Sequence, residues 1–136
     1  MTRLSKAEAL RLGLIKPKSK YNNNKPTYYD PDLKETLTFD SNKELSYYLL
    51  LKDRVKKGEI SDLRRQYKIV IQPPFTDITG TKHRAITYKA DFVYTDRLTG
   101  TERYIDVKGS KATLTEVYKL KKKLLAYKNI IIEEVY

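Results

Sequence analysis

Two apolar runs joined by a short polar turn constrain the fold most. "AITYKADFVYT" at 85–95 and "ERYIDVKG" at 102–109 both have the alternating apolar and polar residues typical of strands. The intervening "DRLTG" predicts a turn, so the two runs form a hairpin. A helix is expected over 113–128 and a strand over 129–135. A hairpin followed by a helix and another strand indicates a mixed sheet with helices packed on it.

The preceding segments supply the rest of the predicted domain. Ser41 can cap the N-terminus of a helix that ends near Lys57, and Gly58 is the residue type that commonly follows a helix C-terminus. We expect residues 1–37 to form a basic N-terminal region and residues 38–136 to form the folded domain. The other expected elements are a helix within 1–12, an extended basic arm or linker over 13–32, a short strand at 35–39 and a strand at 64–72. The predicted fold class is α/β (α+β), with a mixed central sheet of about four strands flanked by helices in the order αβββαβ.

Charge and composition limit the function classes. The chain of 136 residues has a formal net charge of +11, and residues 1–25 and 108–128 each hold seven Lys/Arg against one Glu. Such basic blocks indicate a polyanionic partner, most simply nucleic acid, although a basic protein with solvated lysine faces is the alternative. With no cysteine, there is no disulfide, thiol nucleophile or zinc-thiolate site. Without an apolar run or a signal-peptide stretch, we expect a soluble cytoplasmic protein with no membrane contact.

Charged residues occupy the strand that should be buried. Asp106 and Lys108 lie in "RYIDVKG" and point to the same face, because side chains alternate along a strand. Asp91 lies in the other strand of the hairpin and could approach Asp106. Paired carboxylates suit a hard cation such as Mg²⁺. The alternative is a cross-strand ion pair on a solvated face, and a second D-x-K at 32–34, in a polar loop, shows that the spacing alone means little.

Glu44 is the third acidic candidate. At 100° per residue it falls inside the apolar stripe of the 41–57 helix, near Tyr48 and Leu51. Ser41-x-x-Glu44 also fits a capping box, in which Glu44 reaches back to the Ser41 amide. Both readings remain open from the sequence.

Five segments in this order, "FDSNKE", "LRRQYKIVIQPPF", "YKADFVY", "IDVKG" and "YKLKKKL", resemble the PD-(D/E)XK nuclease superfamily, and within it a family of small phage and prophage proteins. The resemblance covers about residues 38–136 and departs from the pattern at Ala90, where a proline is common. It implies a restriction-endonuclease-like core and Mg²⁺-dependent hydrolysis of DNA, with Mn²⁺ as a substitute. The implied metal ligands are Glu44, Asp91, Asp106 and the carbonyl of Val107.

The resemblance also assigns the remaining roles. Lys108 would orient or deprotonate the attacking water, or stabilise charge on the phosphate. Gln66 would position phosphate or water, or else be an exposed polar residue. Small basic members of the superfamily often resolve four-way DNA junctions as homodimers, so we expect a homodimer on duplex or branched DNA. The expected DNA-contacting residues are Arg64, Arg65, Lys111, Lys119, Lys121, Lys122, Lys18 and Lys20. The alternatives are an inactive DNA-binding module with the same fold and a protein-interaction factor.

Overall fold

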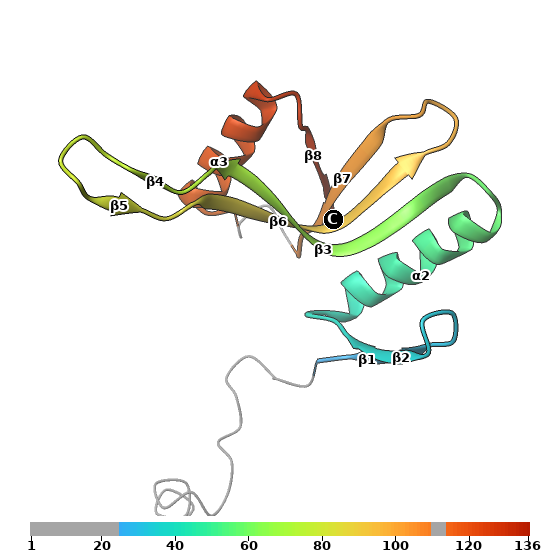
Figure 1. Cartoon of the computed structure of the whole chain (residues 1–136). Helices are drawn as coiled ribbons and strands as arrows, with labels where there is room; N and C mark the ends of the chain where they lie inside the picture. The colour runs from blue at the N-terminus through green and yellow to red at the C-terminus, as the bar shows by residue number, and fades with distance from the viewer. Residues whose placement is uncertain (1–24, 110–113) are drawn as a thin grey trace, which may run out of the picture.

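The fold was obtained as a computed structural model, which describes residues 25–109 and 114–136. It confirms a mixed α+β fold built on a four-stranded mixed sheet with two helices (Figure 1). The expected helix within residues 1–12 and most of the basic arm lie outside the described residues. The described elements are β1 (Thr27–Asp30), β2 (Glu35–Thr38), α2 (Asn42–Lys56), β3 (Ile60–Gln72), β4 (Phe75–Thr76), β5 (Lys82–His83), β6 (Ile86–Asp96), β7 (Glu102–Val107), α3 (Glu116–Tyr127) and β8 (Ile132–Val135).

The central sheet has the strand order β3-β6-β7-β8. The β6–β7 hairpin is confirmed, with Phe92 opposite Ile105 and Thr95 opposite Glu102. β8 pairs with β7 in parallel, so the sheet is mixed as predicted. The crossover through α3 therefore returns the chain to the far edge of β7.

The helix predicted at 41–57 is confirmed as α2. The Ser41 hydroxyl accepts a hydrogen bond from the Glu44 amide at 3.1 Å, which caps the first turn. At the other end Gly58 has φ +75°, the left-handed conformation that ends many helices. Tyr48 and Leu51 are buried in a first core cluster that also contains residues of β2, β3, β6 and β7.

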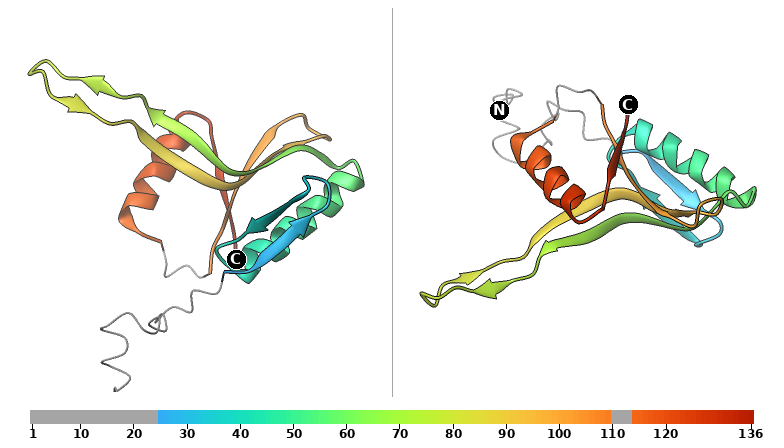
Figure 2. Two further views of the ribbon diagram at one scale, coloured as in Figure 1. Left: turned by 60° about the horizontal axis from the view of Figure 1, so that its bottom comes forward. Right: turned by 90° about the horizontal axis from the view of Figure 1, so that it is seen from above.

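A hairpin of β1 and β2 packs on the outer side of α2 (Figure 2). Leu37 from β2 joins the first core cluster, and Tyr28 from β1 packs against it. The expectation of an extended arm over residues 13–32 is therefore wrong for Thr27–Asp30, which is a strand. The short strand expected at 35–39 is confirmed as Glu35–Thr38.

Helix α3 covers the other face of the sheet (Figure 1). Tyr118 and Leu125 are its buried residues and belong to a second core cluster with Ile69, Tyr88 and Ile132. The lysine-rich segment is helical as predicted, and the face of α3 that packs on the sheet is the one that carries Tyr118. Apolar residues on another side of α3 are exposed in the single chain: Val117, Leu120, Leu124 and Tyr127.

Strand β3 begins four residues earlier than predicted, at Ile60. Two of its residues, Asp62 and Gln66, have positive φ of 55° and 49°. These conformations interrupt the alternation that the sequence pattern relies on. Beyond the irregularity at Gln66, β3 and β6 continue as a two-stranded ribbon that leads to the short β4–β5 pair (Figure 1).

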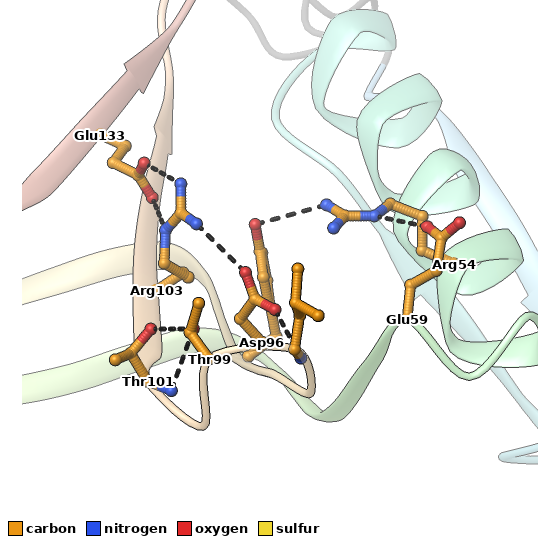
Figure 3. Close-up of polar contacts among 9 residues, drawn as sticks. Arg54, Glu59, Asp96, Thr99, Thr101, Arg103 and Glu133 are labelled. Carbon is orange, nitrogen blue, oxygen red and sulfur yellow. Dashed lines mark hydrogen bonds and ion pairs between the residues drawn. The ribbon is translucent and has the colours of Figure 1, made fainter.

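Polar contacts tie α2 to the sheet at the end farther from this ribbon (Figure 3). Arg54 of α2 donates to the Tyr94 hydroxyl at 3.4 Å and to Glu59 at 3.1 Å. Across the sheet, Arg103 of β7 donates to Glu133 of β8 at 2.7 Å. A pocket of about 650 Å³ opens here, lined by Arg54, Gly58, Glu59, Asp96, Arg97 and Leu98. It contains none of the sequence-predicted catalytic residues.

Within the described residues, no helix is both long and apolar enough to cross a membrane.

Candidate active site

The candidate site forms where β6 and β7 separate. Their last paired residues are Phe92 and Ile105. Immediately beyond this pair, the Asp91 carboxylate accepts a hydrogen bond from the Val107 amide at 2.8 Å. Where β7 leaves β6, the Asp91 side chain thus accepts the Val107 N–H in place of a backbone carbonyl of β6. This arrangement holds the Asp91 carboxylate next to β7.

Two carboxyl groups meet at this fork. Asp91 and Asp106 lie within hydrogen-bonding reach of each other. Burial and the neighbouring Asp106 together raise the pKa of Asp91 to about 7. Two adjacent carboxylates in a partly buried site are unfavourable unless a proton or a cation compensates them.

Lys108 provides part of that compensation. Its Nζ lies 2.8 Å from Asp106 Oδ2, and its side chain is only 17% exposed. The sequence left an ion pair on a solvated face as an alternative for these residues. An ion pair is present, but it is largely buried, and it lies along one strand rather than across two.

Glu44 enters the site from α2 through Gln66. Glu44 is buried at 4% exposure, and its Oε1 accepts a hydrogen bond of 2.9 Å from Gln66 Nε2. The same Nε2 lies 3.5 Å from Asp91 Oδ1, at the limit for a hydrogen bond. Burial, followed by the charge of Asp40, raises the pKa of Glu44. Gln66 therefore joins α2 to β6.

The unusual backbone of β3 explains how Gln66 reaches both acids. Gln66 stands between the pairs Arg65–Phe92 and Tyr67–Ala90, level with Asp91, and has φ +49°. A non-glycine residue adopts this conformation only at some cost. The cost is offset here by the amide contacts with Glu44 and Asp91. The interpretation of Gln66 as a merely exposed polar residue does not fit this position.

Aromatic residues line the other side of Lys108. Its Nζ lies 3.8 Å from the centroid of the Tyr118 ring, a close cation–π contact. The Tyr118 hydroxyl donates to Glu134 at 2.8 Å, and Glu134 is paired with Lys122 at 3.1 Å. Burial opposes ionisation of Glu134, but these two bonds lower its pKa. Lys108 is thus held between a carboxylate and a ring fixed from β8.

Among the described residues, the buried Tyr88 hydroxyl of the site has no hydrogen-bond partner of good geometry. Burial raises the pKa of Tyr88 strongly, and the nearby Asp106 adds to the effect. A buried hydroxyl without a partner is costly. The hydroxyl lies close enough to Asp106 to contact that carboxylate or a group bound beside it.

The donor set fits a magnesium ion held by few protein ligands. Within residues 25–109 and 114–136, no group of three or more His, Cys, Asp or Glu is arranged to hold a metal ion. Gln66 stands between Glu44 and Asp91, which keeps Glu44 from joining the carboxyl pair directly. Mg²⁺, however, usually keeps several waters and is bound through one or two carboxylates. Asp91 and Asp106 meet that requirement.

The expected DNA-contacting residues divide into three groups. Arg64 is paired with Glu102 at 2.8 Å, and Arg65 donates to the Thr38 carbonyl at 2.9 Å with its guanidinium 4.0 Å from the Phe39 ring. Both therefore have intramolecular partners. On α3, Lys119 is paired with Glu116 at 3.3 Å, Lys122 is paired with Glu134, and Lys121 is half-buried. Lys18, Lys20 and Lys111 lie outside the described residues.

Sequence reasoning did not identify Tyr88, Tyr118 and Glu134 as neighbours of the site. Tyr88 lies three residues before Asp91 in the same predicted strand, so regular alternation would point the two side chains to opposite faces. Tyr118 and Glu134 carry no local signal, since their proximity to Lys108 depends on how α3 and β8 pack.

Comparisons with known proteins give one match. The family described as "Protein of unknown function (DUF1064)" matches residues 18–135. No curated protein and no solved structure matches the chain.

Proposed function

We propose that this chain, which belongs to the DUF1064 family, is a metal-dependent endodeoxyribonuclease. The observation that carries the proposal is the meeting of Asp91 and Asp106 beside Lys108, where β6 and β7 separate. The similarity of five sequence segments to the PD-(D/E)XK superfamily supports the same reading.

Asp91, Asp106 and the Val107 carbonyl would hold Mg²⁺, with Mn²⁺ as a substitute. When bound, the metal would polarise the phosphoryl oxygens and lower the pKa of a bound water. Asp91 is positioned for this role by the Val107 amide, which fixes one of its oxygens at 2.8 Å. Glu44 would bind through water, because Gln66 separates it from Asp91.

Lys108 is placed to act as an ammonium ion. Its two neighbours, the Asp106 carboxylate and the face of Tyr118, both stabilise a cation. We propose that it orients the attacking water and stabilises negative charge on the phosphate. Gln66 would hold Glu44 and Asp91 at a fixed separation while the phosphate binds.

The cleavage assay has a matched control. Supercoiled plasmid and a synthetic four-way junction are incubated with Mg²⁺ and either wild type, Asp106→Asn or Glu116→Gln. Glu116 is an exposed carboxylate on α3, so its variant controls for loss of one negative charge. We expect wild type and Glu116→Gln to cut at least one substrate and Asp106→Asn to be inactive. Equal cutting by all three, or no cutting by wild type, contradicts the proposal.

A second candidate is a DNA-binding module without catalysis. The observation that favours it is that Lys108 already pairs with Asp106 and Gln66 already binds Glu44. The acids are thus partly compensated without a cation. Calorimetric titration with Mn²⁺ separates the two: the enzyme should bind with heat that Asp91→Asn abolishes, whereas the inactive module should show none. We retain a homodimer as part of the proposal, to be tested by sedimentation velocity.

A further inference from the structure

The β3–β6 ribbon projects from the sheet past the edge of α3 and ends in the β4–β5 pair (Figure 2). We call residues 68–89 the arm. This segment is distinct from the basic N-terminal segment, residues 13–32, described above. One face of its base is covered by α3, where Ile69 and Tyr88 lie opposite each other in the second core cluster. The other face carries exposed side chains, among them Lys68, Val70 and Lys89, which no other residue of 25–109 or 114–136 buries.

The charged residues of this arm are mostly basic. The arm contains Lys68, Lys82, Arg84 and Lys89 against the single acid Asp77. All four basic residues are exposed, and none of them makes an ion pair with another described residue. This separates them from Arg64, Lys119 and Lys122, which are all paired.

Two of the lysines face each other directly. Lys68 on β3 lies opposite Lys89 on β6 in the register of the ribbon. Like charges at directly opposite positions of an antiparallel pair are destabilising. An anion that binds both ammonium groups removes this repulsion. The pair lies only two residues from Gln66 and Asp91, next to the candidate active site.

The turn at the end of the arm is stabilised by hydrogen bonds to Asp77. Asp77 accepts hydrogen bonds from the Thr79 and Thr81 amides at 2.8 and 3.1 Å and contacts His83 Nε2 at 2.7 Å. Bonds from the Thr79 side chain and from His83 lower the pKa of Asp77 to about 2. The His83 ring also stacks on Phe75 with 4.7 Å between centroids. The one acid of the arm is therefore bonded within its own turn, and it forms no ion pair with a lysine of the described residues.

We propose that the arm binds the phosphate backbone of duplex DNA beside the bond to be cut. A two-stranded ribbon has the dimensions of the major groove, and unpaired Lys and Arg side chains along it match the two flanking phosphate chains. The inference rests on the proposed function, because the DNA is the substrate of that site. The new element is the DNA-binding surface. We assign it to the arm rather than to Arg64 and Arg65.

Affinity and its salt dependence test the arm. Binding of a fluorescent 30-base-pair duplex by the full chain is measured by anisotropy in EDTA, from low to physiological salt. The arm variants are Lys68→Gln/Lys89→Gln and Lys82→Gln/Arg84→Gln. The matched control, Lys56→Gln/Arg97→Gln, removes the same charge at the opposite end of the molecule, where both side chains are exposed.

Each arm variant should bind on the order of tenfold more weakly, and the slope of log K against log salt should become shallower by about 1.8, since each phosphate contact contributes about 0.9. The control should change the slope by less than either arm variant. Equal effects of all three variants, or no effect of the arm variants, overturn the assignment.

A shortened arm gives a second readout. Replacing residues 73–85 by Asn-Gly closes the ribbon between Gln72 and Ile86, which already face each other. This removes about 20 Å of ribbon. Hydroxyl-radical footprints should then lose about 6 base pairs of protection on one side of the bound region. An unchanged footprint contradicts the proposal.

The outcomes separate the arm from the proposed function. If wild type cuts DNA in Mg²⁺ but the arm variants bind like wild type, the arm assignment fails and the nuclease stands. If the arm variants bind DNA less tightly but wild type never cuts, the arm stands and the catalytic proposal fails. If the arm variants keep DNA affinity but lose self-association in sedimentation velocity, a second copy occupies the arm and the DNA assignment is wrong.

Discussion

The Asp91 carboxylate accepts a hydrogen bond of 2.8 Å from the backbone amide of Val107, in the strand that also carries Asp106. One acidic side chain thereby fixes the distance between two strands and presents its second oxygen to a neighbouring carboxyl group. The structure and the proposed chemistry depend on the same contact.

Asp91→Asn should abolish cleavage without reducing metal-free stability. The asparagine carbonyl can still accept the Val107 amide, while the unfavourable pairing with Asp106 disappears. We expect a gain of about 1 kcal/mol in the free energy of unfolding at pH 8 in EDTA. Urea denaturation of wild type and variant measures it. A clear loss of stability would show that the carboxylate pair is not strained.

Asp106→Asn, in contrast, should lower the free energy of unfolding. Asp106 is buried at 7% exposure, and its removal leaves Lys108 without its carboxylate partner. Breaking a largely buried pair is destabilising by about 3 kcal/mol. The same urea titration at pH 8 compares it with Asp91→Asn. Equal shifts for the two variants would contradict the distinct roles assigned to these acids.

Tyr118 should position Lys108 through its ring rather than its hydroxyl. The Nζ lies 3.8 Å from the ring centroid, so Tyr118→Phe keeps the contact and Tyr118→Leu removes it. A cation–π contact of 1 to 2 kcal/mol predicts about a tenfold loss of kcat for the leucine variant and much less for phenylalanine. Single-turnover cleavage measures both, with melting temperatures to show that each variant folds. Equal losses for the two would assign the role to the hydroxyl instead.

Asp30 should make the stability of the protein sensitive to acid. Burial alone would raise its pKa, but bonds from Tyr48, Lys52 and the amides of Asp32 and Leu33 lower it to about 2. Because the folded pKa lies below the ordinary value of 3.8, this contribution is complete above pH 4 and is lost as the pH falls toward 2.

The matched variant is Asp30→Asn. At pH 7 it should be about 2 kcal/mol less stable than wild type, and the difference should shrink as the pH falls from 4 to 2. Urea denaturation at several pH values gives the comparison. A difference that stays constant with pH would mean that the Asp30 charge contributes nothing.

Gly58→Ala should weaken the end of α2. The glycine has φ +75°, which an alanine adopts only with strain. We expect a loss of about 1 kcal/mol in unfolding free energy. Gly109→Ala serves as the control, because a Cβ there meets nothing within 4 Å and the backbone is not left-handed. Thermal denaturation of both variants tests the difference.

The sequence predicted the elements that alternate or repeat regularly. The β6–β7 hairpin, α2 with its Ser41 cap, and the mixed sheet follow from local patterns. It also placed Glu44 correctly toward the core, since helical geometry alone determines that angle. Ser41 caps the amide of Glu44, while the carboxylate binds Gln66 instead of completing the capping box.

Tertiary packing decided the features that the sequence did not predict. The helical spacing of apolar residues over 113–128 predicts one apolar stripe, made of Leu114, Val117, Leu120, Leu124 and Tyr127. The sheet instead buries Tyr118 and Leu125, because Tyr118 packs at a tilt against Tyr88 and its hydroxyl reaches Glu134. As a buried face, the predicted stripe was therefore wrong for Val117, Leu120, Leu124 and Tyr127, which are exposed.

The β1–β2 hairpin was overlooked for a different reason. Its strands have only four residues each, and polar residues dominate the turn between them. The decisive interaction is the buried Asp30, which joins the turn to Lys52 of α2 at 3.0 Å. A single aspartate before a proline gives no indication of a partner twenty-two residues away.

That hairpin also supports the helix that carries Glu44, one of the proposed site residues. Phe39 lies 5.3 Å from Tyr48 between ring centroids, and Leu37 and Tyr28 close the same cluster from outside. A fragment starting at residue 38 would retain every proposed ligand yet expose the back of the helix that delivers Glu44. Loss of activity in such a fragment would reflect a loosened scaffold rather than a missing reactive group.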